Sequence, residues 1–276
     1  MLEIPEALTI AKQINNTIKG RKVVDVIANY SSHKFAWYHG EPQDYKELLR
    51  GSTIQNATAC GGLVHIKLDS AVILIGDGAN LRYHEKGQKT PAKHQLLLEL
   101  DDSSKVSATV QMYGGIWCFR DEAEFDNIYY KIAKEKPSPL SEEFDEEYFN
   151  KLISQQEVQK LSIKVFLATE QRIPGLGNGV LQDILWNASV NPKTKVSSLD
   201  DEQLHELFKA IKSVLCEMTD LNGRDTEKDF FGNNGGYKTM MSKNNVDSPC
   251  VKCGTIIKKE TYYGGSIYYC EKCQPK

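Results

Sequence analysis

The sequence contains no apolar run that approaches the length of about eighteen residues needed to span a membrane. It also has no large excess of either charge, because 34 lysine and arginine residues face 37 aspartate and glutamate residues and leave a net charge of −3. No secretory leader opens the chain, and no internal repeat runs through it. A membrane partner is therefore not expected, and any binding to nucleic acid must come from a local basic face. We expect a cytoplasmic protein that acts as a monomer.

Cysteine, in contrast, is well represented, with seven residues in a chain of 276. Four of them form two CxxC pairs, Cys250 with Cys253 and Cys270 with Cys273, separated by a gap of sixteen residues. Each pair turns both thiolates toward one ion, so this spacing is typical of a tetrahedral zinc ribbon. The sequence predicts one structural zinc ion held by these four cysteines. Zinc ribbons occur in nucleic-acid binding, in protein contacts and as purely structural elements, so the ribbon does not identify the function.

The residues between the two pairs predict the hairpin that a ribbon requires. Thr255–Ile257 and Ser266–Tyr269 are rich in β-branched or aromatic side chains, which favour strands. A disulfide framework is the alternative for these cysteines. The missing leader and three scattered cysteines, Cys60, Cys118 and Cys216, favour zinc.

The first half of the chain predicts one helix followed by many short strands. An apolar stripe indicates a helix from Pro5 to Ile18, with Pro5 in its first turn and Gly20 at its end. Turn signals, among them Gly76-Asp77-Gly78 and Gly114-Gly115, separate the strands. The strands are expected at Val23–Ile27, Phe35–Tyr38, Thr53–Thr58, Leu63–Leu68, Ala71–Ile75, Gln95–Leu100, Ser107–Tyr113 and Ile116–Phe119. Short strands with tight turns indicate an antiparallel sandwich or barrel.

The second half changes to a helical pattern after Pro137-Ser138-Pro139, which breaks the chain. The helices are expected at Phe144–Ile153, Val158–Ala168, Gly179–Ala188 and Asp200–Leu221. A stretch of glycine and asparagine, Gly232–Gly236, predicts a flexible loop before the ribbon. We therefore expect an α+β protein with a sandwich domain over 1–136, a hinge over 137–148, a helical domain over 149–246 and a ribbon over 247–276.

A glycine-rich turn lies before the third of these helices. Gly175 and Gly177 let the backbone come very near another surface, and Asn178 can cap the helix that follows. A helix N-terminus with free amides after such a turn is a seat for a phosphate group. Taken alone, the segment is more simply interpreted as an ordinary capped turn.

The turn does not stand alone, because several motifs follow one another along the chain. They are Glu3-Ile4-Pro5-Glu6, Pro139-Leu140-Ser141, the turn from Gly175 to Asn178, Asn191-Pro192 and the four-cysteine ribbon. This order resembles the formamidopyrimidine-DNA glycosylase/endonuclease VIII family over essentially the full chain. The resemblance implies an N-terminal β-sandwich bearing the first helix and a helix–two-turns–helix domain that ends in a zinc finger. It also implies a nucleoid-associated protein that clamps double-stranded DNA between the two and flips out a damaged nucleotide, with Gly175, Gly177 and Asn178 at the DNA.

The start of the chain departs from this family. Members usually begin Met-Pro-Glu-Leu-Pro-Glu, and the proline amine, freed by removal of the initiator, attacks the sugar C1′ to form an imine that permits strand cleavage. Here Leu2 replaces that proline, and a bulky second residue normally prevents removal of Met1. The free amine then lies on Met1, displaced by about 3.8 Å, which near-attack geometry does not tolerate. If Met1 were removed, a primary amine on Leu2 could still form an imine. We expect weak or absent AP-lyase activity.

Other positions that the family uses for DNA also differ. The family's phosphate-binding lysine corresponds to Gly62, the arginine of its zinc-finger hairpin to Gly265 and its methionine wedge to Asp77. Lys67 lies out of register with the first of these. Fewer basic residues near phosphate weaken binding and flatten its dependence on salt.

The turn that fills the gap left by the flipped base corresponds to Gln111, Met112 and Tyr113, followed by Gly114. Tyr113 is either a wedge between bases or a strand-end aromatic packed in the sandwich. Thr226–Ser242 is either a lid over the lesion or a mobile surface loop. As a lid, it would bring Tyr237 and Lys238 to the lesion or its phosphate.

Two carboxylates keep their family places, Glu3 that of the proton donor and Glu6 that of a supporting acid. Base excision does not require an amine, since a carboxylate can activate water and a carboxylic acid can protonate the departing base. Alternatively, both acids only stabilise the positive end of the first helix. The sequence favours a glycosylase that hydrolyses a damaged base from DNA. The alternatives are a damaged-DNA binding protein without catalysis and a protein-interaction module stapled by its ribbon.

Overall fold

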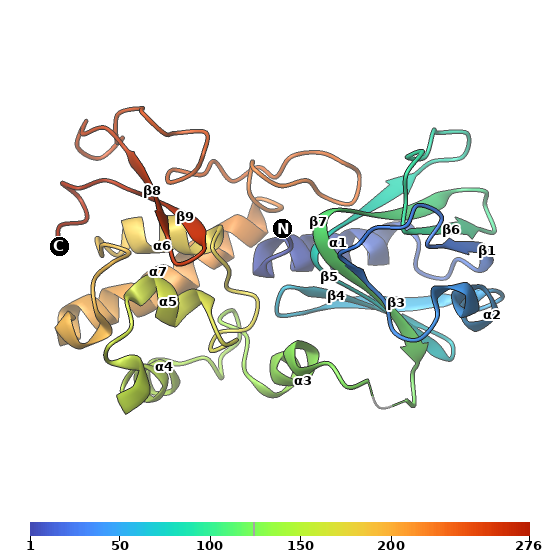
Figure 1. Ribbon diagram of the computed structural model, residues 1–276, viewed down its shortest axis with the longest axis horizontal. Coiled ribbons are helices and arrows are strands. Elements are labelled where there is room, and N and C mark those ends of the chain that lie inside the picture. Colours follow the sequence, from blue (N-terminus) through green and yellow to red (C-terminus); the bar gives the residue numbers. More distant parts are fainter. Residues whose placement is uncertain (124) are drawn as a thin grey trace.

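The computed structural model describes residues 1–123 and 125–276. Figure 1 shows a strand-rich lobe beside a helical lobe, with the start of the chain and helix α1 (Ile4–Thr17) where the two lobes meet. The N-terminal antiparallel sheet, the helical second lobe and a four-cysteine hairpin confirm the predicted α+β fold.

Helix α1 belongs to the cores of both lobes. Ala7, Ile10 and Ile14 are buried in the core of the strand-rich lobe, where the helix packs on β3 (Ile54–Cys60) and β4 (Leu63–Leu68). Ile4, one turn before, is buried in the core of the helical lobe. The first turn of α1 is therefore fixed at the junction between the two lobes.

The sheet follows the order β1-β6-β7-β5-β4-β3, and β2 pairs parallel with β7. The remaining strands are β1 (Val23–Ala28), β2 (Ala36–Trp37), β5 (Ala71–His84), β6 (Leu96–Leu100) and β7 (Lys105–Arg120). A 3₁₀ turn (Pro42–Asp44) and α2 (Tyr45–Leu49) precede β3. The halves of β5 and β7 pair with different neighbours, so these two long strands connect both layers around one core.

Two predicted turns are wrong because they lie inside these long strands. Gly76 pairs with Gly115 and Asp77 with Gly114, and the register shifts between Asp77 and Ala79. A Cβ on Gly76 would lie 2.4 Å from the Leu63 side chain, and one on Gly115 would lie 1.9 Å from the Trp117 ring. The glycines thus make room for neighbouring side chains at a bulge, where the strands bend and continue.

The helical lobe contains α4 (Glu146–Ile153), α5 (Ile163–Ala168), α6 (Val180–Asn187) and α7 (Asp201–Asp220), with 3₁₀ turns at Gln156–Val158 and Val196–Ser198. The helix predicted from Val158 is wrong over its first part, because Ser162 caps α5 and begins the helix there. Helices α2 and α3 (Ile128–Glu135) were not predicted. Both are short, with five and eight residues, and give little periodic signal.

The hairpin of the ribbon is formed by β8 (Lys258–Tyr262) and β9 (Gly265–Tyr269). The prediction of the second strand is confirmed, whereas that of Thr255–Ile257 is wrong. Those residues complete the first cysteine knuckle instead, since the Cys250 amide donates to the Thr255 carbonyl at 2.8 Å.

The segment predicted as a flexible loop crosses from one lobe to the other. Phe230 is fully buried in the core of the strand-rich lobe, and its carbonyl accepts from the Tyr83 amide at 2.8 Å. Tyr237 is buried in the core of the helical lobe, and its amide donates to the Gly223 carbonyl at 3.0 Å. The glycine-rich stretch is therefore anchored on both sides. Within residues 1–123 and 125–276, none of the helices combines the length and apolar character that a bilayer crossing requires.

Candidate active site and cysteine cluster

Glu3 immediately precedes α1, and its side chain reaches across to the helical lobe. One carboxylate oxygen, Oε1, accepts from the Gly179 amide at 2.8 Å, and Oε2 accepts from the Val180 amide at 2.7 Å. These amides form the positive N-terminal end of α6, where a carboxylate is favoured. Burial raises the pKa of Glu3, and the nearby Arg224 guanidinium opposes this rise. Glu3 is thus a buried acid held between the two lobes.

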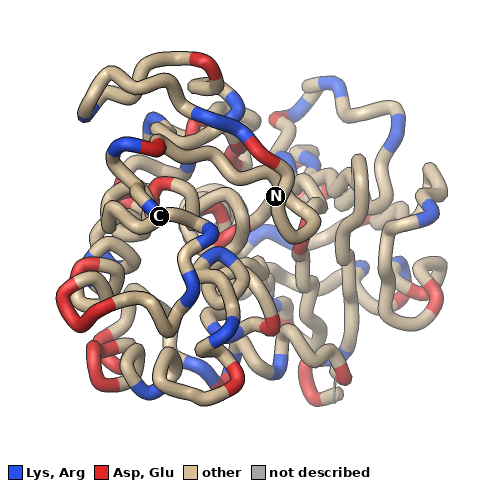
Figure 2. Tube along the Cα trace, turned by 60° about the vertical axis from the view of Figure 1, so that its left-hand side comes forward, with Lys and Arg blue, Asp and Glu red and all other residues tan. Residues whose placement is uncertain are grey.

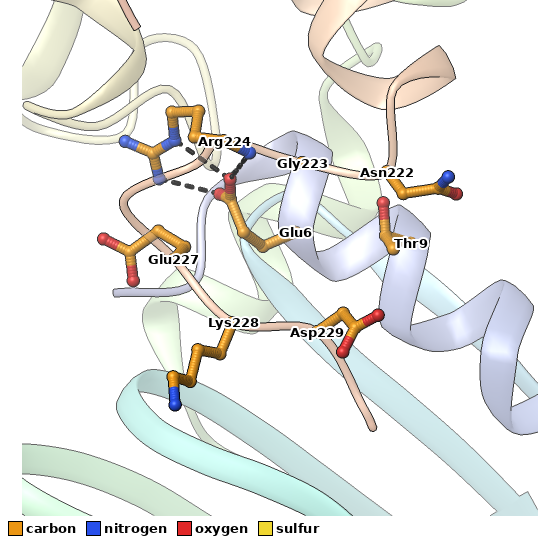
Figure 3. Close-up of a pocket in the computed structure, with 8 residues that line it drawn as sticks. All are labelled: Glu6, Thr9, Asn222, Gly223, Arg224, Glu227, Lys228 and Asp229. Carbon is orange, nitrogen blue, oxygen red and sulfur yellow. Dashed lines mark hydrogen bonds and ion pairs between the residues drawn. The ribbon is translucent and has the colours of Figure 1, made fainter. Parts of the chain in front are cut away.

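Arg224 joins Glu3 to Glu6, and sequence reasoning did not identify it. Its Nε and Nη2 atoms donate to the two carboxylate oxygens of Glu6 at 2.9 and 2.7 Å, as Figure 3 shows. Its Nη1 atom lies 3.4 Å from Oε2 of Glu3. Only 2% of the arginine side chain and 4% of each carboxylate side chain are exposed, so the three charges are shielded from water. One guanidinium is paired with two carboxyl groups, so the cluster carries one formal negative charge when both acids are ionised.

The glycine-rich turn approaches the strand-rich lobe closely. A Cβ on Gly175 would lie 2.2 Å from the Gly62 amide nitrogen, and one on Gly177 would lie 2.6 Å from Oε1 of Glu3. At Gly179, a Cβ would lie 1.6 Å from Nη1 of Arg224. In this structure these glycines therefore make room for other parts of the protein. The expectation of free amides for a phosphate at this helix end is wrong for Gly179 and Val180, because Glu3 occupies both.

Asn178 does not cap α6, whose N-cap residue is Gly179. Its side-chain nitrogen instead donates to the Ser266 carbonyl on β9 at 2.9 Å. Its Oδ1 atom is buried and has no hydrogen-bond partner within the described residues. A Cβ on Gly265 would lie 3.3 Å from this oxygen. Asn178 therefore links the glycine-rich turn to the cysteine hairpin, and its side-chain oxygen accepts no hydrogen bond from the described residues.

The first two residues lie beside the bulge at which β5 and β7 bend. The Leu2 amide donates to the Asp77 carbonyl at 2.9 Å. The Met1 nitrogen donates to Oε2 of Glu227 at 2.5 Å, and the Tyr113 hydroxyl lies 3.7 Å from the Met1 sulfur. Tyr113 is thus near the start of the chain.

The other residues predicted at the DNA lie in different surroundings. Gln111 and Met112 are exposed on β7, and the Lys238 side chain is 76% exposed, with its Nζ atom 3.9 Å from Asp225. Tyr237 is 95% buried, and its hydroxyl is hydrogen-bonded to Asp183, which is also buried. The suggestion that Tyr237 touches the lesion is therefore wrong for this conformation, because its ring belongs to the core.

The four cysteines of the ribbon converge on one point. Their sulfur atoms all lie within 4.8 Å of one another, and none of the seven cysteines, all of which lie in the described ranges, forms a disulfide. Four thiolates at this separation are suited to a single tetrahedral metal ion. Cys60, Cys118 and Cys216 lie outside this cluster, as predicted.

The fold and the site together define a class: a two-lobed protein joined by a buried acid–arginine–acid cluster and ending in a four-cysteine finger. Residues 1–112 match the formamidopyrimidine-DNA glycosylase N-terminal domain, and residues 136–229 match the formamidopyrimidine-DNA glycosylase H2TH domain. The chain belongs to the formamidopyrimidine-DNA glycosylase/endonuclease VIII family.

Individual relatives share the whole length of the chain. The formamidopyrimidine-DNA glycosylase of Bacillus cereus is 27% identical over 285 residues, and that of Bacillus subtilis is 25% identical over 287 residues; each alignment covers 100% of both chains. The fold is similar to that of Lactococcus lactis Fpg, solved in complex with DNA that contains an abasic site. This similarity has a TM-score of 0.82 at 23% identity and covers 99% of this chain and 100% of that one.

Proposed function

We propose that this protein is a DNA glycosylase of base-excision repair. It binds double-stranded DNA between its lobes, takes a damaged nucleotide out of the stack and hydrolyses the bond between base and sugar. The position of Glu3 carries this proposal: an acid with a raised pKa lies at the junction between the lobes, against the N-terminus of a helix. Family membership and the names of the Bacillus relatives support it.

The chemistry requires a proton for the departing base. The protonated Glu3 carboxyl donates it as the bond from C1′ to the base nitrogen breaks and its electron pair moves to the base. Water then adds to C1′ and gives up a proton to the resulting carboxylate. The amides of Gly179 and Val180 stabilise that carboxylate in its ionised form. Glu6 and Arg224 position Glu3 and do not touch the reacting atoms.

Strand cleavage through an imine is weak or absent in this proposal. Leu2 replaces the family's proline, and its nitrogen donates to the Asp77 carbonyl. The Met1 amine pairs with Glu227. Borohydride should therefore trap no covalent adduct with abasic DNA, and the intact mass of the purified protein reports whether Met1 is retained. A trapped adduct would show that an amine is active.

The ion at the cysteine cluster is proposed to be zinc. A donor set of four thiolates on a hairpin favours zinc over magnesium or calcium, which prefer oxygen ligands. Lys252 lies over the Trp186 ring at 4.0 Å, and Cys250 and Cys270 pack in the same small core. Zinc here would stabilise the hairpin that Asn178 contacts, and take no part in the reaction.

The decisive experiment is a base-release assay on duplexes with oxidised, ring-opened or alkylated bases, followed by alkaline cleavage of the abasic products. Glu3→Gln should lose at least roughly 100-fold in single-turnover rate while still binding the same duplex. Glu6→Gln is the matched control, since it disturbs the same arginine without removing the proposed acid. The proposal is wrong if no lesion is released, or if Glu3→Gln releases base as fast as the parent.

A damaged-DNA binding protein without catalysis is the second candidate, and Gly62 favours it. A Cβ at Gly62 would lie 3.0 Å from the Leu2 carbonyl oxygen, so no side chain replaces the family's lysine there without a shift. Gel shifts with lesion-containing and plain duplexes, run beside the base-release assay, distinguish the two. Discrimination between these duplexes without any release would identify a binding protein.

A further inference from the structure

Exposed aromatic and apolar side chains gather on the strand-rich lobe beside the start of the chain. Phe35 is 48% exposed, Trp37 43% and Met112 74%. Trp37 belongs to β2 and Met112 to β7, which pair in parallel with Ala36 opposite Gly114, and Phe35 directly precedes β2. The Gly114 amide also donates to the Phe35 carbonyl at 2.9 Å. The neighbouring backbone hydrogen bonds therefore fix the position of Trp37.

Trp37 packs beside Tyr113, which is interpreted from the sequence either as a wedge between bases or as a strand-end aromatic. Its ring centroid lies 5.8 Å from that of Tyr113, with the two planes tilted by 37°. The Tyr113 hydroxyl in turn lies 3.7 Å from the Met1 sulfur. The two rings thus form a continuous aromatic surface that begins near Met1 and ends in solvent.

This surface suits a nucleobase better than a phosphate. Aromatic side chains bind bases through stacking, which does not depend on the base's identity. Ionic binding is weakly supported in this chain: glycines stand at positions 62 and 265, and positive and negative residues are mixed along the trace of both lobes, as Figure 2 shows. One cation borders the surface, because Nζ of Lys34 lies 5.3 Å from the centroid of the Phe35 ring. It can meet the phosphate attached to a stacked base.

We propose that Trp37, together with Tyr113, is a stacking platform for an unpaired base of the bound DNA. This inference rests on the proposed function, because it needs DNA between the lobes. Extrusion of one nucleotide leaves the base opposite it without a pairing partner, and that opposite base is the occupant. The platform compensates for the missing lysine and arginine, and Trp37 is the residue that gives preference for DNA with an unpaired base.

Tryptophan fluorescence tests the contact directly. Trp117 and Trp186 are 8% and 6% exposed, so Trp37 supplies the accessible emission. The parent is titrated with a duplex carrying a tetrahydrofuran abasic analogue and with the same duplex intact. The abasic duplex should quench Trp37 emission more strongly than the intact one. In parallel, anisotropy gives the affinities of the parent, Trp37→Ala, Trp37→Phe and Tyr129→Ala. Tyr129 is an exposed tyrosine on α3, outside β2 and β7, and serves as the matched control.

Trp37→Ala should bind the abasic duplex at least roughly tenfold more weakly than the parent does. This factor should be the same at low and at high salt. The variant should bind the intact duplex with the affinity of the parent. Trp37→Phe should keep most of the affinity, and Tyr129→Ala all of it. If the parent binds the abasic duplex but neither its emission nor the affinity of Trp37→Ala changes, the platform is wrong and the proposed function stands. If the parent binds no DNA even at low salt, both proposals are wrong.

Discussion

Glu3 and Val180 are joined by a 2.7 Å hydrogen bond although 177 positions separate them in the sequence. The acid that precedes α1 therefore interacts with the N-terminal end of α6, and Arg224 completes the contact from the segment after α7. Because these three residues come from three distant parts of the chain, the relative position of the lobes and the geometry of the acid depend on each other. A change at this cluster should affect stability and catalysis together.

Replacing Arg224 with methionine should lower the free energy of unfolding by about 3–5 kcal/mol, because it leaves two buried carboxylates without a cation. Denaturant unfolding measures this change. Arg21→Met is the control: Arg21 pairs with Asp102 on the surface, and its loss should cost about 1 kcal/mol or less. Adding Glu3→Gln and Glu6→Gln to Arg224→Met should recover part of the stability. A loss no larger than that of Arg21→Met would contradict the role of the cluster.

A methyl group at Gly177 should displace the proposed acid. The Cβ of Gly177→Ala would lie 2.6 Å from Oε1 of Glu3, so the carboxylate must move. We expect a loss of about 1–3 kcal/mol in stability and a larger loss of base release than of DNA affinity. Gly87→Ala strains the backbone at a φ of 81° but meets no atom within 4 Å, so it should keep base release. Equal base release in both variants would show that Glu3 need not keep this position.

The sequence predicted the fold well where local patterns decide it. The apolar stripe of α1 predicts that helix from nearby residues alone, and the spacing of the ribbon cysteines does the same for the metal site. Arg224 could not be found in this way, because its partners are remote and nothing around it marks a buried cation. The same holds for Gly76 and Gly115: a glycine that ends a strand and one that accommodates a neighbouring ring look alike until the partner strand is known. The capping role predicted for Asn178 is wrong for the same reason, because its hydrogen-bond partner, the Ser266 carbonyl, lies 88 positions away in the sequence.

Removal of one cysteine of the cluster should release the metal. Cys270→Ser should lower the bound zinc from one ion per chain to a small fraction and lower the melting temperature, because metal binding stabilises the folded hairpin. Cys216→Ser changes an exposed cysteine outside the cluster and should leave both unchanged. Elemental analysis and thermal unfolding, with and without a chelator, provide the measurements. Full zinc content in Cys270→Ser, or none in the parent, would contradict the proposed site.

The activity should decline as pH rises. Burial raises the pKa of Glu3 above its ordinary 4.5, so the protonated acid persists to higher pH than in an exposed glutamate. The single-turnover rate of base release should be highest below this raised pKa and fall as pH passes through it. Glu3→Gln should show a low rate without this step, whereas Glu6→Gln should retain the step with a shifted midpoint.

The free energy of unfolding should depend on the same protonation of Glu3. The protonated form of Glu3 contributes stability fully below the pKa of the unfolded chain, and this contribution is lost as pH rises through the higher pKa of the folded chain. The difference in unfolding free energy between the parent and Glu3→Gln should therefore shrink with rising pH over the interval in which the rate declines. Two results together would contradict this prediction: a rate that increases with pH over that interval, and a stability difference that stays constant. They would mean that Glu3 is ionised in the folded protein and acts as a base.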